Sequence, residues 1–241
     1  MNSGNARTGS RAWIRFLGAY LLTLGACASV MAQAPEGPPP GGGPYQPSDL
    51  VELVKLDPTI KLDIRYATAN NFVGRAVYPE ARAFLQRPVA EALISVQRWL
   101  NAKGYGLVIY DAYRPWSVTK LFWDVTPPDQ RIFVADPAVG SVHNRGCAVD
   151  LGLYDLKTGR EADMPGAYDE PSERSFVTYT GGTPDQRANR DLLRKAMERD
   201  GSFFVLPEEW WHYDYKEFMA YAVQNIPFSA IRTPAATRAT N

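Results

Sequence analysis

The sequence predicts an α+β fold, a single domain in which helices flank a largely antiparallel central sheet. Two observations lead to this prediction. Segments with strand-like alternation and segments with helical periodicity both occur, and they follow one another without the regular alternation of a parallel α/β fold. The 241 residues are 45% hydrophobic and 22% charged, without internal repeats, which is the composition of an ordinary globular domain.

The first 34 residues predict a signal peptide. Arg7, Arg11 and Arg15 precede an apolar run over 16–26 and small residues over 28–32. The apolar run is too short to cross a bilayer, which needs about 20 residues. A buried N-terminal helix is the alternative, and the pattern favours it less.

Two cleavage positions compete. Cleavage after Ala32 would release a soluble protein, whereas the Leu-Gly-Ala-Cys pattern ending at Cys27 resembles a lipoprotein signal and would leave a lipid anchor on that cysteine. Either route exports the protein, so we expect a periplasmic or secreted product with no transmembrane segment in its mature form. The leader removes three of 26 basic residues and none of 26 acidic ones, so the charge becomes −3 and gives no reason to expect a nucleic-acid partner.

Residues 35–48 predict a linker, because ten of the thirteen residues at 35–47 are proline or glycine. We expect the folded domain to cover 49–232 and a flexible tail to cover 233–241. Once the leader is removed, Cys147 is the only remaining cysteine, or is accompanied only by a lipidated Cys27. No internal disulfide is therefore expected.

In the first half of this domain, extended segments are predicted at 51–56 and 60–66. A helix should begin at Pro88, because proline suits the first helical position, and end at Gly104. Its apolar stripe recurs at spacings of four, three and four residues: Val89, Leu93, Val96 and Leu100.

The second half contains one further strong helix, capped by Thr183, with Gln186 able to complete a capping box, and ended by Gly201. A long loop is predicted over 157–182. The remaining expected elements are strands at 106–110, 148–154, 203–205 and 210–215 and a short helix at 117–125.

The chain has two histidines, and the first, His143, lies seven residues before Asp150. In one uninterrupted strand these side chains would face opposite sides, but the turn-prone residues 144–146 can reset the direction of the chain. A neutral imidazole and a carboxylate together suit Zn²⁺. The pair alone is weak evidence for a metal site.

The second histidine, His212, would complete three protein ligands, the number that a catalytic zinc site uses. Glu209, three residues earlier, could then act as general base and acid. In an ideal strand Glu209 and His212 would face apart, so a turn or bulge near Pro207 must bring them together. The alternative is an aromatic core strand whose histidine joins a hydrogen-bond network, and composition does not decide between the two.

Arg114 precedes Pro115, which keeps its backbone out of the α region. Its guanidinium could stabilise an oxyanion near a metal, or it could form a surface salt bridge. Asp111 could orient Arg114 or cap the end of the preceding strand.

Two motifs resemble a known family: Ser-x-His-x-x-Gly-x-Ala-x-Asp at 141–150 and Glu-Trp-Trp-His at 209–212. They are similar to those of the zinc D-Ala-D-Ala dipeptidases of the VanX type, within a wider group that includes D-Ala-D-Ala carboxypeptidases and hedgehog-like domains. The resemblance covers most of residues 50–225, and further matching stretches lie at 66–72, 104–107, 111–115 and 168–175.

The resemblance implies one role for each matching position. His143, Asp150 and His212 match the ligands of a single zinc ion. Glu209 matches the general base and acid, and Arg114 the residue that stabilises the tetrahedral intermediate. The remaining matches are substrate contacts: Tyr66 and Asp169 for the ammonium group and Ser141 for the carboxylate end.

The resemblance therefore implies a zinc-dependent enzyme that hydrolyses the small peptide D-Ala-D-Ala to free D-Ala in cell-wall peptide turnover. The alternatives are a D,D-carboxypeptidase or endopeptidase that acts on larger peptidoglycan peptides, and a non-catalytic zinc-containing binding domain. An open groove would favour the longer substrates, whereas Asp169 at the far end of a closed pocket would favour the dipeptide.

Overall fold

The computed structural model describes residues 36–232. The predicted signal peptide over 1–34 and tail over 233–241 therefore lie outside the described residues. Residues 36–48, the described part of the predicted linker, form no helix or strand. Within the described range, no helix is both long and apolar enough to cross a membrane.

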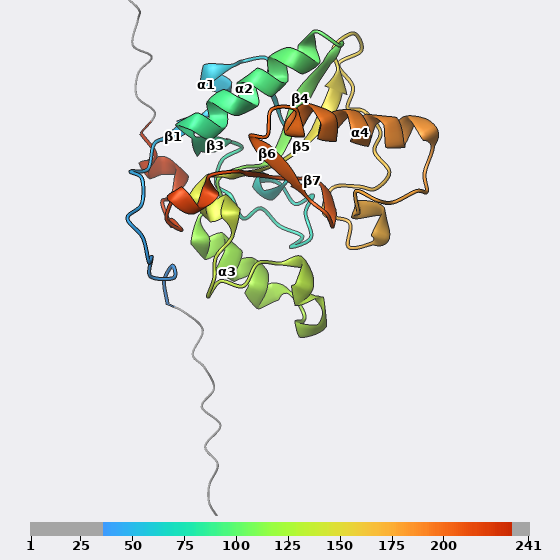
Figure 1. Cartoon of the computed structure of the whole chain (residues 1–241). Coiled ribbons are helices and arrows are strands. Elements are labelled where there is room, and N and C mark those ends of the chain that lie inside the picture. Colours follow the sequence, from blue (N-terminus) through green and yellow to red (C-terminus); the bar gives the residue numbers. More distant parts are fainter. Residues whose placement is uncertain (1–35, 233–241) are drawn as a thin grey trace, which may run out of the picture. The chain divides into compact units, whose positions relative to one another are not determined.

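The centre of the molecule is a five-stranded sheet with the order β2-β4-β5-β7-β6. Figure 1 labels β4, β5, β6 and β7 of this sheet. Only β2 and β4 are parallel, and every other neighbouring pair is antiparallel. The largely antiparallel α+β fold predicted from the sequence is thus confirmed. The strands are β2 (Lys61–Leu62), β4 (Tyr105–Asp111), β5 (Ala148–Asp155), β6 (Phe203–Leu206) and β7 (Glu209–Tyr215).

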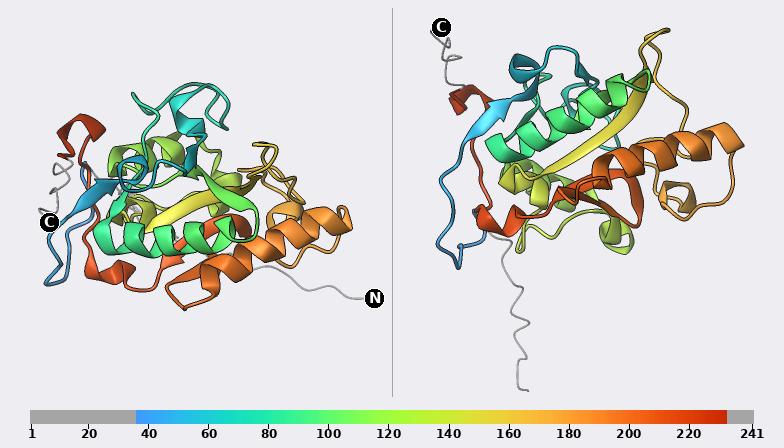
Figure 2. Two further views of the ribbon diagram at one scale, coloured as in Figure 1. Left: turned by 90° about the horizontal axis from the view of Figure 1, so that it is seen from above. Right: turned by 45° about the horizontal axis from the view of Figure 1, so that its top comes forward.

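Two long helices, α2 (Arg87–Asn101) and α4 (Pro184–Glu198), lie side by side over one face of the sheet (Figure 2). The apolar stripe predicted for α2 is wholly buried, which anchors this helix to β4. The predicted capping box of α4 is also present, with Thr183 and Gln186 exchanging hydrogen bonds. A shorter helix, α3 (Trp116–Val125), lies on the other side of the sheet (Figure 1).

The segment at 51–56 is not one extended strand. β1 (Leu50–Glu52) pairs with β3 (Phe84–Gln86), a strand the sequence did not predict, and the pairing ends at Glu52. The chain then forms a single helical turn, α1 (Leu53–Leu56), in which the Asp57 N–H donates to the Leu53 carbonyl at 2.9 Å. The alternating pattern fits either conformation, and pairing with the three residues of β3 covers only the first part of this segment.

The segment at 60–66 is also shorter as a strand than predicted. Only Lys61–Leu62 pair, and a 3₁₀ turn at Arg65–Ala67 (η1) follows. The loop predicted over 157–182 contains one further 3₁₀ turn at Glu173–Ser175 (η4) and no long element. This loop runs from the end of β5 to the start of α4 and contributes to the site described next.

Candidate metal centre and active site

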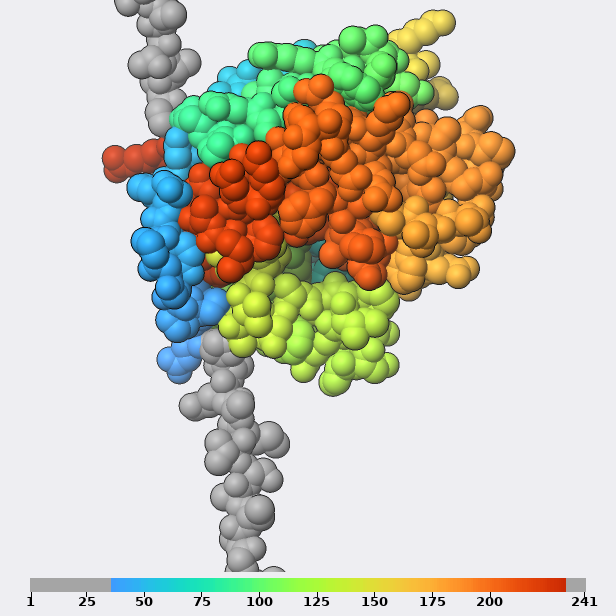
Figure 3. Space-filling view, viewed as in Figure 1, coloured from blue at the N-terminus to red at the C-terminus, as the bar shows by residue number. Residues whose placement is uncertain are grey.

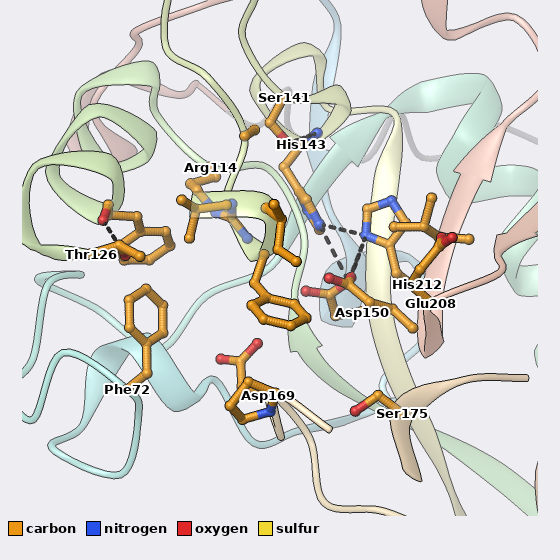
Figure 4. A pocket seen from close by; sticks show the side chains of 18 of the residues that line it. Phe72, Arg114, Thr126, Ser141, His143, Asp150, Asp169, Ser175, Glu208 and His212 are labelled. Carbon is orange, nitrogen blue, oxygen red and sulfur yellow. Dashed lines mark hydrogen bonds and ion pairs between the residues drawn. The ribbon is translucent and has the colours of Figure 1, made fainter. Parts of the chain in front are cut away.

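His143, Asp150 and His212 meet in one buried cluster (Figure 4). Asp150 in β5 stands directly opposite His212 in β7, so the register of the sheet brings these two together. Asp150 Oδ1 lies 3.0 Å from His212 Nδ1 and 3.3 Å from His143 Nε2, and the two nitrogens are 3.1 Å apart. Three candidate ligand atoms thus converge on one point.

The outward-facing nitrogens of both histidines have acceptors of their own. His143 Nδ1 lies 2.7 Å from the Ala112 carbonyl oxygen, and His212 Nε2 lies 2.9 Å from the Asp214 carboxylate. A ring nitrogen that faces an acceptor carries the proton, which leaves the other nitrogen of each neutral ring with its lone pair turned into the cluster.

Two lone pairs and a carboxylate oxygen at this distance repel one another unless a cation lies between them. The observed separations of 3.0 to 3.3 Å approach the edges of a tetrahedron with bonds of about 2.0–2.1 Å, which are near 3.3 Å. The donor set therefore fits a divalent metal such as zinc. Protons compete with a metal ion for His212. Hydrogen bonds to Asp150 and Asp214 outweigh the effect of burial and hold the pKa of His212 well above its usual value.

His143 lies in a short 3₁₀ turn at Val142–Arg145 (η3), and side chains at both ends of this turn hold it. Ser141 Oγ accepts the His143 N–H at 3.2 Å, while the Asn144 amide oxygen accepts the Ser141 N–H at 2.7 Å. Gly146 then takes φ of 70°, and an added Cβ there would stand 2.5 Å from Leu50. The predicted change of direction between His143 and Asp150 is thus a capped turn that ends at a glycine.

Glu209 begins β7, and a bulge brings it toward the cluster. Val205 pairs with Tyr213, but its neighbour Leu206 pairs with Glu209, so the residues between Glu209 and Tyr213 have no partner in β6. Glu209 Oε2 consequently lies 3.8 Å from His212 Nδ1, and burial raises the pKa of this carboxyl. This bulge is the irregularity that the sequence required near Pro207.

Arg114 is buried and rigidly held. Its Nε and Nη2 donate to Asp111 Oδ2 at 3.0 and 2.8 Å, and its guanidinium lies over the Phe122 ring at 4.9 Å. The other oxygen of Asp111 accepts the Tyr78 hydroxyl at 2.7 Å and the Ala112 N–H at 2.9 Å. Asp111 therefore performs both roles that the sequence left open, and the surface salt bridge considered for Arg114 is excluded.

Tyr66 and Asp169, which come from loops 103 residues apart, contact each other directly. The Tyr66 hydroxyl donates to Asp169 Oδ2 at 2.6 Å. Burial raises the pKa of Asp169 to about 7, because few groups nearby compensate its charge. A cation such as a substrate ammonium would supply that compensation.

These residues share one cavity of about 720 Å³. Eight of the nine sequence-predicted site residues line it, and Asp111 lies behind Arg114. The cavity lies between β7 on one side and α3 with the following turn on the other, and Figure 3 shows it as a hollow in the surface. Apolar side chains also line it, including Phe72, Phe122 and Ile132.

Two polar groups at the cluster were not predicted from the sequence. Asp214 binds His212, and the Tyr168 hydroxyl donates to Asp150 Oδ2 at 2.9 Å. Asp214 could have been found, because residues two apart on a strand share a face. Tyr168 offered no such signal, since its contact with Asp150 depends on the path of the long loop.

Comparison with known proteins now identifies the family. A family model described as D-Ala-D-Ala dipeptidase matches residues 46–230, which is more than half of the chain. The chain belongs to this family. It is therefore a metallopeptidase, and the resemblance inferred from the two motifs is confirmed.

Two dipeptidases with similar sequences agree with this assignment. The chain is 35% identical over 187 residues to a D-alanyl-D-alanine dipeptidase of Escherichia coli strain K12, covering 78% of this chain and 95% of that protein. It is 37% identical over 172 residues to a D-alanyl-D-alanine dipeptidase of Enterococcus faecalis, covering 64% and 85%. A crystal structure of a vancomycin-resistance D,D-dipeptidase with a D-Ala-D-Ala phosphinate analogue aligns over 57% of this chain and 52% of that one, with 22% identity and a TM-score of 0.37.

Proposed function

We propose that this protein is a zinc-dependent dipeptidase that hydrolyses D-Ala-D-Ala to two molecules of free D-Ala in cell-wall peptide turnover. One observation carries the proposal. The metal-binding triad, Glu209 and Arg114 line the same cavity as Asp169, a half-buried carboxylate to which no cationic side chain of the described residues is bonded. The relatives named above are dipeptidases for this substrate, which supports the choice of peptide.

His143, Asp150 and His212 would hold the metal ion. A divalent metal there would polarise the scissile carbonyl and lower the pKa of a water molecule. Two histidines and one carboxylate leave a position open for such chemistry, which is the arrangement of catalytic rather than structural zinc sites.

The residues around this site would divide the remaining work. Glu209 accepts a proton from the attacking water and later donates it to the amine of the departing D-Ala. Arg114, held by Asp111, places positive charge where the carbonyl oxygen becomes negative. Because Arg114 is already fixed by Asp111, little reorganisation is needed when that charge develops.

The two ends of the dipeptide would be recognised by opposite charges. Asp169, with Tyr66, binds the ammonium group, and Ser141 donates a hydrogen bond to the carboxylate end. A requirement for a free ammonium explains why a half-buried carboxylate lines the cavity with no cationic side chain of residues 36–232 bonded to it. It also favours a dipeptide over the end of a longer chain.

A second candidate is a D,D-carboxypeptidase or endopeptidase that acts on larger peptidoglycan peptides. It is supported by the size of the cavity, since about 720 Å³ is the volume of pockets for drug-sized ligands and exceeds what D-Ala-D-Ala fills. A non-catalytic zinc-binding module is disfavoured, because such a domain has no use for Glu209 and Arg114 beside the metal.

Release of free D-Ala distinguishes these candidates. Purified protein would be incubated with D-Ala-D-Ala, with N-acetylated D-Ala-D-Ala and with a wall peptide that ends in D-Ala-D-Ala. The proposal expects rapid cleavage of the free dipeptide, little cleavage of the two blocked peptides, and loss of activity on chelation that zinc restores. If only the longer peptides were cleaved, the dipeptidase proposal would be wrong and the second candidate function would be supported.

We also propose that the protein is exported, on the support of the basic and apolar leader over 1–34. Export suits turnover of wall peptides or recycling of the released dipeptide. It does not suit removal of a wall precursor in the cytoplasm. The mass of the mature protein would separate cleavage before Gln33 from a lipidated Cys27, and an uncleaved cytoplasmic product would contradict export.

A further inference from the structure

Tyr168 links the metal ligand Asp150 to the predicted ammonium-binding residue Asp169. Its hydroxyl donates to Asp150 Oδ2 at 2.9 Å, and the next residue along the chain is Asp169. It belongs to the loop between β5 and α4, so neither strand pairing nor a helix fixes it. None of the roles described above uses this side chain.

The Tyr168 ring is nevertheless closely held by aromatic and cationic neighbours. It lies 4.7 Å from the Tyr110 ring and 5.5 Å from the Trp211 ring, measured between centroids, and the Arg65 guanidinium lies 5.9 Å from its centre. It also lines a second cavity of about 330 Å³. The packing of the ring therefore helps to set the direction of the hydroxyl.

The two carboxylate oxygens of Asp150 have different partners. Oδ1 is the atom that faces both histidines, while Oδ2 is the atom that Tyr168 binds. Without that bond the carboxylate could rotate and offer either oxygen, or both, to a metal. Partners of this kind typically contribute 10- to 100-fold to metal affinity.

The backbone directly after Tyr168 supports the other half of the site. Asp169 has φ of 58°, a left-handed conformation that costs free energy for any residue with a Cβ. This turn of the chain directs the Asp169 carboxylate toward Tyr66. The Tyr168 ring is thus held at the residue directly before this turn.

We propose that Tyr168 is a positioning residue that ties the metal ligand Asp150 to the ammonium-binding residue Asp169. Its hydroxyl selects the oxygen that Asp150 presents to the metal, and its ring holds the turn that presents Asp169. The part that concerns substrate rests on the function proposed above. The part that concerns the metal does not.

Zinc binding tests the hydroxyl without any assay of turnover. Metal-free protein would be titrated with Zn²⁺ against a competing chelator for the wild type, Tyr168→Phe and Tyr110→Phe. Tyr110→Phe is the matched control, because the Tyr110 ring packs on Tyr168 and its hydroxyl binds Glu161, away from the metal ligands. We expect the dissociation constant of Tyr168→Phe to rise about tenfold or more and that of the control to stay within twofold. Equal affinities for all three proteins would overturn the proposal.

Kinetics at saturating zinc test the ring. In Tyr168→Phe the ring remains, so KM for D-Ala-D-Ala should stay near the wild-type value while kcat falls. In Tyr168→Leu the ring is lost, and KM should rise as well. A rise in KM in the Phe variant, or an unchanged KM in a folded Leu variant, contradicts the role of the ring. If no variant and no wild-type protein cleaves the dipeptide, the dipeptidase function fails while the zinc titration still decides the role of the hydroxyl.

Discussion

The catalytic and the recognition residues of this site are held in different ways. Asp150, His212 and Glu209 belong to β5 and β7, where pairing across the sheet fixes their positions. By contrast, Asp169 lies in a long loop, Tyr66 in a 3₁₀ turn, and Ser141 immediately before another such turn. Most of the reaction centre is thus built on the sheet, with His143 in a capped 3₁₀ turn and Arg114 just after β4, whereas the contacts for the substrate's ends are built on connections.

The recognition residues lie on loops and turns, so hydrogen bonds to other residues of the site must fix their positions. Each recognition residue is bonded to another residue of the site, Asp169 to Tyr66 and Ser141 to the His143 backbone, and the positioning residue Tyr168 is bonded to Asp150. We therefore expect substitutions on the sheet to lower kcat with little change in KM. Substitutions of the recognition residues Asp169, Tyr66 and Ser141 should act chiefly on KM.

Glu209→Gln should have the largest effect. It keeps the size of the side chain and removes the proton acceptor, so kcat should fall by about 10²- to 10⁴-fold while zinc remains bound. Steady-state rates and metal analysis would be measured together. Glu208→Gln is the matched control, because Glu208 lines the same cavity but is exposed. Equal activity in the two variants would remove Glu209 from the mechanism.

Arg114→Lys should follow, with a loss in kcat of about 10²- to 10³-fold. Lysine keeps the charge but cannot reproduce the planar fork that binds Asp111. Thermal unfolding would be measured too, since a weakened partner for the buried Asp111 carboxylate also lowers stability. Arg75→Lys, at an exposed position of the same cavity, is the control. A loss confined to KM would place Arg114 with the recognition residues.

The same division explains what the sequence alone could predict. The apolar stripe of α2, the capping box of α4 and the apolar runs of β4 and β5 are local signals, and all four elements form where expected. β3 has three residues and is defined by its pairing with β1, so no local sequence pattern predicts it. The motifs at 141–150 and 209–212 likewise contain the metal cluster, whereas Tyr168 and Asp214 become partners of its ligands only through the folded arrangement.

Asp169→Asn should raise KM for D-Ala-D-Ala by roughly 10- to 100-fold, since a hydrogen bond to a charged group contributes about 1.5–3 kcal/mol. The Tyr66 hydroxyl can still donate to the asparagine oxygen, so the turn should persist. Glu170→Gln is the neighbouring control, because Glu170 binds Ala167 and Ser172 instead of Tyr66. An unchanged KM in Asp169→Asn would assign ammonium recognition to another group.

The pH dependence of KM is a second test of ammonium recognition by Asp169. Burial raises the pKa of Asp169 from 3.8 to about 7, with Asp150 and Glu209 adding to the effect and the Tyr66 hydroxyl and Arg114 opposing it. Below its pKa the group is neutral and cannot pair with an ammonium, so KM should rise as the pH falls. A bound metal ion lowers this pKa, so the midpoint in the zinc-loaded enzyme should lie between 3.8 and about 7. Asp169→Asn should lose this dependence.

Ser141 should show the smallest effect, and it is the residue that most directly tests the division between sheet and loops. Its Oγ accepts the His143 N–H, so it caps the turn that carries a metal ligand, and it also lines the cavity. Ser141→Ala loses the cap and the hydroxyl, at a cost of about 1 kcal/mol for the cap. Ser141→Asp keeps a good capping acceptor but repels a substrate carboxylate, whereas Ser141→Asn keeps both an acceptor and a donor. If Ser141 contacts the substrate, KM should rise several-fold in the Asp variant and stay near the wild-type value in the Asn variant. If it serves only as a cap, the Asp and Asn variants should match the wild type and the Ala variant alone should bind zinc more weakly, which would move Ser141 from the recognition residues to the metal centre.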